Sequence, residues 1–95
     1  MVAYVVVSRE KTYDSAELAI YRQKAPAARN GHSLTVRSHN ARYEVVEGPA
    51  IEAIAILEFP TFEEAKAWYD DPVYREALEF RLRGGEHRAV IVEGL

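Results

Sequence analysis

The sequence of 95 residues contains no cysteine, no block of basic residues and no long apolar run. Without cysteine, disulfides and thiol nucleophiles are excluded, and the compartment is left open. The apolar run at residues 2–7 is too short for a signal peptide or a membrane span, and no basic segment precedes it. Charges of both signs are spread along the chain, with a net charge of −3. We therefore expect a cytoplasmic protein that binds neither nucleic acid nor a membrane.

The length fits a single domain over residues 1–95. With 48% hydrophobic residues the chain is apolar enough to fold. A chain this short buries only about 60–65% of its unfolded surface, so its stability is marginal unless something adds burial.

Four stretches of apolar, often β-branched residues predict strands, at residues 2–7, 33–48, 52–59 and 87–94. The second stretch predicts one long strand or two, interrupted around residues 38–40. Asn40 tolerates left-handed backbone angles, so a bulge or bend fits there.

Two helical regions alternate with these strands. Capping boxes at Asp14/Glu17 and Thr61/Glu64 predict where they begin, and Asp71-Pro72 predicts a restart of the second. Pro26 predicts a kink or the end of the first helix, and Gly84-Gly85 predicts the end of the second. Phe62, Ala65 and Tyr69 fall at helical spacing and predict the face that packs on a sheet. The resulting order, βαββαβ, predicts an α+β, ferredoxin-like fold in which two helices cover one face of a four-stranded antiparallel sheet.

The strands are apolar on both faces. In the first strand, Val2, Tyr4 and Val6 alternate with Ala3, Val5 and Val7. Two helices cover only one face, so the other would expose a large apolar patch to water. We therefore expect a homodimer that packs sheet against sheet and buries about 1,600 Å² or more.

The segment EFPTFEEAKAWYDDPVY, residues 58–74, together with the closing VIVEGL, resembles the family called domain of unknown function 1330. The matching positions are Glu58-Phe59-Pro60, Ala65, Ala67, Trp68, Tyr69, Pro72, Tyr74, Glu93 and Gly94, with Tyr21, Arg37 and Glu47-Gly48 upstream. Ser38-His39 replaces a Gly-Gly common in relatives, and Leu18 replaces a common tyrosine. The resemblance implies a dimeric α/β barrel. It implies no reaction, because that superfamily includes cofactor-independent monooxygenases, isomerases, haem proteins and ligand-sensing modules.

Five residues are candidates for binding a ligand between helices and sheet: Tyr21, Arg37, Tyr69, Tyr74 and Arg81. An arginine can hold a carboxylate or phosphate through a bidentate fork. The alternative for the arginines is an ion pair with Glu47, Glu58 or Glu93.

Two residues are candidates for acid–base chemistry. Glu58 shares a strand face with Ile54 and Ile56, where an unpaired carboxylate would be costly, and His39 lies at the bend after Arg37. The alternatives are a Glu58 that reaches solvent or an arginine, and a His39 in a solvated loop. The three histidines lack metal-site spacing, and no phosphate loop or nucleophile elbow is present, so we expect no metal and no cofactor.

These observations favour a homodimer that binds a small organic ligand, which can be anionic. One alternative is a cofactor-independent enzyme acting on an activated carbon acid, with His39 or Glu58 as the base. A second alternative is an interaction module without a ligand of its own.

Overall fold

The central strand of the sheet is β1 (Ala3–Thr12), formed by the β-branched run near the N-terminus. The computed structural model describes all of residues 1–95. Strand β1 pairs antiparallel with β3 (Ala53–Phe59) on one side and β4 (Gly85–Glu93) on the other, and β2 (Thr35–His39) pairs with the far edge of β3. The sheet order is β2-β3-β1-β4. The predicted ferredoxin-like arrangement and α+β class are confirmed.

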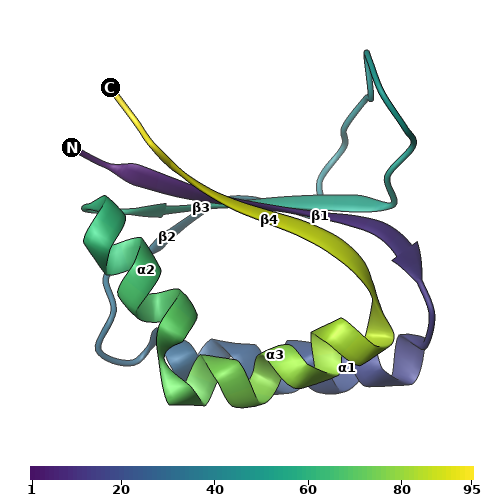
Figure 1. The fold of residues 1–95 in the computed structure, drawn as a ribbon, viewed down its shortest axis with the longest axis horizontal. Coiled ribbons are helices and arrows are strands. Elements are labelled where there is room, and N and C mark those ends of the chain that lie inside the picture. The colour runs from purple at the N-terminus through teal and green to yellow at the C-terminus, as the bar shows by residue number, and fades with distance from the viewer.

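The helices all lie on one side of this sheet (Figure 1). Helix α1 (Ser15–Lys24) continues into a short 3₁₀ turn, η1 (Ala25–Arg29), where Pro26 ends the α-helix as expected. The second helical region is two consecutive helices, α2 (Phe62–Asp70) and α3 (Pro72–Gly84). No helix combines the length and apolar character that crossing a membrane requires.

Side-chain caps begin the helices. Asp14, Thr61 and Asp71 each accept a hydrogen bond from a first-turn backbone N–H, at 3.0, 3.1 and 2.8 Å. These bonds satisfy donors that have no partner inside the helix. The reciprocal half of the first capping box does not form, because the Glu17 side chain pairs instead with Arg83. The distance from Glu17 Oε1 to Arg83 Nε is 3.5 Å.

The prediction for residues 33–48 is largely wrong. Strand β2 is only five residues long and ends at His39. Asn40 then adopts a left-handed conformation with φ of 51°, and its N–H donates to the carbonyl of Ile54 at 3.1 Å. This turn directs residues 40–52 away from the sheet as an irregular loop, on the side opposite the helices (Figure 1). The left-handed angle at Asn40 was correctly anticipated.

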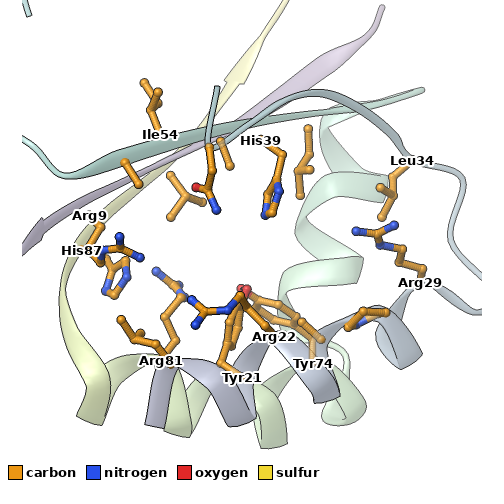
Figure 2. A pocket seen from close by; sticks show the side chains of 18 of the residues that line it. Arg9, Tyr21, Arg22, Arg29, Leu34, His39, Ile54, Tyr74, Arg81 and His87 are labelled. Carbon is orange, nitrogen blue, oxygen red and sulfur yellow. The ribbon is translucent and has the colours of Figure 1, made fainter. Parts of the chain in front are cut away.

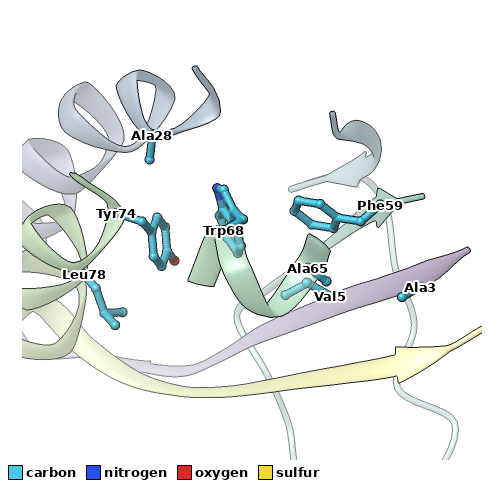
Figure 3. Packing of buried hydrophobic residues seen from close by; sticks show 8 residues of the cluster. All are labelled: Ala3, Val5, Ala28, Phe59, Ala65, Trp68, Tyr74 and Leu78. Carbon is cyan, nitrogen blue, oxygen red and sulfur yellow. The ribbon is translucent and has the colours of Figure 1, made fainter. Parts of the chain in front are cut away.

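The core lies between the helices and one sheet face and is built around aromatic rings that pack against one another at a tilt (Figure 3). Ring centroids lie 5.4 Å apart for Phe59 and Trp68 and 4.1 Å apart for Trp68 and Tyr74. Helix α2 buries Ala65 and Trp68, whereas Phe62 is exposed, so the predicted packing face of this helix is wrong at Phe62. Small residues facing the rings leave room for them.

The opposite, outer face of the sheet has no helix over it. It carries Tyr4 and Val6 from β1, Ile54 and Ile56 from β3, and Val90 and Val92 from β4. Val90 and Val92 are about half exposed, at 48% and 47%. The loop at residues 40–52 stands on this side and adds exposed apolar side chains of its own, Tyr43, Val45 and Val46. This surface is the apolar patch that the alternation of the strands predicts.

Candidate functional site

A cavity of about 390 Å³ lies between the inner face of the sheet and the helices, and 19 residues line it. Eleven of them are hydrophobic, four are arginines and two are histidines, and none is aspartate or glutamate. The chain as a whole has more acidic than basic residues. The cavity is therefore a local concentration of positive charge inside an acidic protein.

Arg81 is the central feature of the cavity. It belongs to the buried face of α3, only 4% of its surface is exposed, and its Nε and Nη1 have no hydrogen-bond partner. In Figure 2 its side chain rises from α3 into the cavity. Its guanidinium carbon lies 5.8 Å from the ring centre of Tyr21. Buried charges in proteins are almost always paired, so an unpaired guanidinium marks a place where a partner is missing.

Tyr21 and Tyr74 form the floor of the cavity beside Arg81 (Figure 2). Their hydroxyl oxygens lie 2.8 Å apart, and the rings meet edge to face at 82°. Burial raises the pKa of Tyr74 well above its ordinary value, so this hydroxyl stays protonated. Two hydroxyls that share one hydrogen bond leave one O–H free to donate to a ligand.

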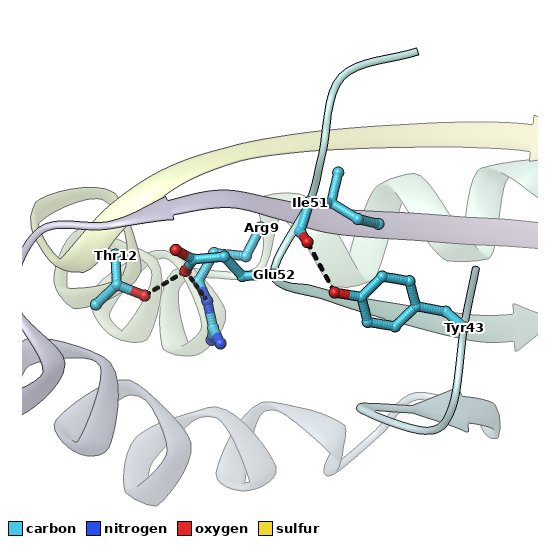
Figure 4. Close-up of polar contacts among 5 residues, drawn as sticks. All are labelled: Arg9, Thr12, Tyr43, Ile51 and Glu52. Carbon is cyan, nitrogen blue, oxygen red and sulfur yellow. Dashed lines mark hydrogen bonds and ion pairs between the residues drawn. The ribbon is translucent and has the colours of Figure 1, made fainter. Parts of the chain in front are cut away.

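His87 and Arg9 occupy the β4 and β1 side of the same cavity. Burial and, after it, the neighbouring charge of Arg81 lower the pKa of His87 to about 4, so the imidazole is neutral at pH 7. Its Nδ1 is buried and has no partner. Arg9 is fixed by Glu52, whose Oε1 lies 3.2 Å from its Nε and also accepts from the Thr12 hydroxyl at 2.6 Å (Figure 4).

The structure brings together three of the five predicted ligand-binding residues. Tyr21, Tyr74 and Arg81 line the cavity, whereas Arg37 and Tyr69 do not. The ring of Tyr69 lies 4.6 Å from the guanidinium carbon of Arg75. Arg37 falls at a bulge in β2, and its guanidinium donates to Glu58 at 3.2 and 3.3 Å.

The two acid–base candidates are separated by the sheet. His39 lines the cavity and points into it from above in Figure 2. Glu58 pairs across the strands with Tyr4 and so belongs to the outer face, where Arg37 neutralises it. The ion-pair alternative is the one observed for both Arg37 and Glu58.

Sequence reasoning missed Arg9, Arg22, Arg29 and His87 as cavity residues. Strand alternation could have identified two of them. Arg9 continues the inward series of Val5 and Val7, and His87 lies two positions before Ala89. No group of three or more His, Asp or Glu side chains is arranged to hold a metal ion.

Comparison with known proteins adds a family and a set of similar folds. The family model described as a domain of unknown function, DUF1330, matches residues 2–95. A search of the curated proteins finds no match.

Solved structures with similar folds cover nearly the whole chain. A protein of unknown function from Rhodopseudomonas palustris is 17% identical, with a TM-score of 0.75 over 99% of this chain and 82% of the other. A dimeric ferredoxin-like protein from Thermobifida fusca is 14% identical, with a TM-score of 0.64 over 99% and 92%. A dimeric protein from Bacteroides fragilis is 15% identical, with a TM-score of 0.63 over 98% and 96%. At these identities the likeness shows the shared fold alone.

Proposed function

Because this chain belongs to the DUF1330 family, whose description assigns no activity, we propose its function from the cavity: each protomer of a homodimer binds a small organic anion. The single observation that carries the proposal is Arg81, a buried guanidinium with unpartnered nitrogens in a cavity without carboxylates. An anion bound there would supply the missing charge and hydrogen-bond acceptors.

The rest of the lining suits an organic ligand better than a bare inorganic ion. Most lining residues are hydrophobic, and the tyrosine pair offers flat apolar surface beside Arg81. Trp68 also lines the cavity, and its indole Nε1 is buried without a partner. Small-molecule sites are typically apolar cavities of about 300–1,000 Å³ with a few polar groups that orient the ligand.

The outer face of the sheet supports the dimer. Its apolar side chains and the projecting loop at residues 40–52 present a surface that a second copy can cover by twofold symmetry. Similar folds from two bacteria are described as dimeric. In this arrangement the Arg37–Glu58 pair lies on the interface side and takes no part in ligand binding.

The proposal is tested by isothermal titration calorimetry with two aromatic anions, benzoate and phenyl phosphate, and with neutral benzyl alcohol. At least one anion should bind more tightly than the alcohol, and Arg81→Gln should weaken it about tenfold or more because a charge-assisted contact is lost. Arg83→Gln is the matched control, because Arg83 lies on the same helix and outside the cavity lining. Equal binding to the Arg81→Gln variant and the unaltered protein would contradict the proposal.

A second candidate function is favoured by the position of His39. Its imidazole lies in the cavity, where it could act as a general base on an activated carbon acid without a cofactor. Nuclear magnetic resonance in D₂O would detect exchange at the acidic carbon of acetoacetate. An enzyme should lose about 10²–10⁴-fold of its exchange rate in the His39→Gln variant. A protein that leaves the exchange rate at its solution value is not this enzyme.

A further inference from the structure

The basic residues of the cavity are unevenly placed. In Figure 2 the side chains of Arg9, Arg22 and Arg81 point toward one end of the cavity, where His87 also lies. Arg29 lies at the opposite end, beside Leu34. Three guanidinium groups therefore reach the same region from three different elements, β1, α1 and α3.

The positive charge at this end is only partly neutralised. Arg9 pairs with Glu52, while Arg22 and Arg81 form no ion pair. Glu52 lies outside the cavity lining and is itself exposed. Three guanidinium charges against one carboxylate leave an excess of two positive charges, which matches a dianion better than a monoanion.

The three guanidinium groups approach this end of the cavity from different directions, which suits a phosphoryl group better than a carboxylate. A carboxylate is planar and is satisfied by one bidentate guanidinium fork. A phosphoryl group has three acceptor oxygens and a charge of about −1.5 to −2 at pH 7, so it accepts donors from several directions at once. Arginine is the residue best suited to that kind of contact.

We propose that the end of the cavity formed by Arg9, Arg22 and Arg81 binds the phosphoryl group of a small phosphomonoester. The apolar part of the ester lies over Tyr21 and Tyr74 and extends toward Leu34. This inference deepens the function proposed above and rests on it. The free tyrosine O–H and the Nδ1 of His87 are available to position the ester beside the arginines.

The test is calorimetric titration of the full chain with phenyl phosphate and benzoate, which share a ring and differ in the acidic group. Phenyl phosphate should bind about tenfold more tightly or better at about pH 7.5, where it is a dianion, and should lose that advantage at about pH 5, below its second pKa of about 6. Arg22→Gln is the informative variant, because Arg22 is exposed on α1 and its replacement does not threaten the fold. It should weaken phenyl phosphate about tenfold and benzoate less than about threefold, with Arg83→Gln unchanged for both.

The other outcomes separate this inference from the function on which it rests. If benzoate and phenyl phosphate bind equally and both need Arg81, the phosphoryl assignment fails and the anion site stands. If neither binds, both fail. If inorganic phosphate binds as tightly as phenyl phosphate, the site binds free phosphate, and the proposal of a phosphomonoester ligand is wrong. Tighter binding of terephthalate, dependent on Arg29, would replace the phosphomonoester with a diacid held at both ends of the cavity.

Discussion

The two faces of the sheet differ in the size and charge of their side chains. The inner face carries alanines such as Ala3, Ala53 and Ala55, together with Arg9 and His87. The outer face carries large aliphatic residues from three adjacent strands. Small residues leave space for aromatic rings and a cavity, whereas a continuous layer of large ones makes a flat apolar surface. This difference supports the two proposals, that the inner face binds a ligand and that the outer face forms the dimer.

Charged residues follow the same division. On the outer face Glu58 is held by Arg37, with two hydrogen bonds between the side chains. On the inner side Arg81 is far more buried, forms no ion pair with a carboxylate, and has two nitrogens without a hydrogen-bond partner. Desolvating an unpaired charge costs stability, so its persistence in the folded chain is explained by a ligand more readily than by architecture.

The largest effect should come from placing a charge on the outer face. Val90→Asp should raise the dissociation constant of the dimer about a thousandfold or more, because twofold symmetry buries two unpaired carboxylates at once. Val73→Asp on α3 is the matched control, since the two valines are almost equally exposed, at 48% and 47%. Sedimentation velocity measures both variants. A Val90→Asp variant that stays dimeric would show that assembly does not use this face.

Replacing Arg81 should have an intermediate effect, and it should stabilise the folded protein. Arg81→Met keeps a similar volume and removes the buried charge, so the free energy of unfolding should rise by about 1–3 kcal/mol. Urea denaturation measures the change, with Arg83→Met as control. The same variant should lose its response to bound anion. A less stable Arg81→Met protein would mean that the guanidinium stabilises the fold.

The smallest effect concerns pH. The pKa of His87 is lowered to about 4 in the folded protein, whereas it is about 6.5 in an unfolded chain. Between these values the unfolded state binds more protons, so stability falls as the pH drops from about 6.5 to about 4. The loss should be about 1–2 kcal/mol, less than the full shift implies, because the ring is partly exposed to solvent.

Thermal denaturation across this pH range, compared between the unaltered protein and His87→Gln, isolates this contribution from those of the carboxylates. The His87→Gln variant should show a flatter profile above about pH 4. Parallel profiles for the two proteins would place His87 in solvent in the folded state. Benzoate bound beside Arg81 should shift the pKa of His87 upward, so its binding should take up protons at pH values just above about 4.

Local sequence patterns predicted most of the fold. Helix caps at Asp14, Thr61 and Asp71 depend on residues a few positions apart, and the sequence displays them directly. The long second strand was wrong because Tyr43, Val45 and Val46 have high strand propensity, yet the turn at Asn40 removes them from the sheet. Strand propensity measures how well a side chain fits the pleated surface of a sheet. It does not indicate whether a neighbouring strand is present to pair with.

The cavity was only partly predictable. Which residues line it depends on the face of the sheet that each strand residue occupies and on how the helices pack on that sheet. Tyr21, Tyr74 and Arg81 were found because helical spacing puts them on inward faces. Arg37 was misplaced because alternation from Thr35, whose cross-strand partner is Glu58, puts it on the outer face, whereas the bulge after Val36 turns His39 inward. The arginines at one end of the cavity come from three elements that are far apart in the sequence. No local sequence pattern could have predicted that they meet there.

Native mass spectrometry of the purified protein tests in a single measurement whether one face of the sheet forms a dimer while the other binds a ligand. We expect a species of twice the chain mass of 10.8 kDa that takes up two molecules of phenyl phosphate, and much lower uptake by the Arg81→Gln variant at the same ligand concentration. A monomer would contradict the role of the outer face, and equal uptake by the unaltered protein and the Arg81→Gln variant would contradict the role of the inner one.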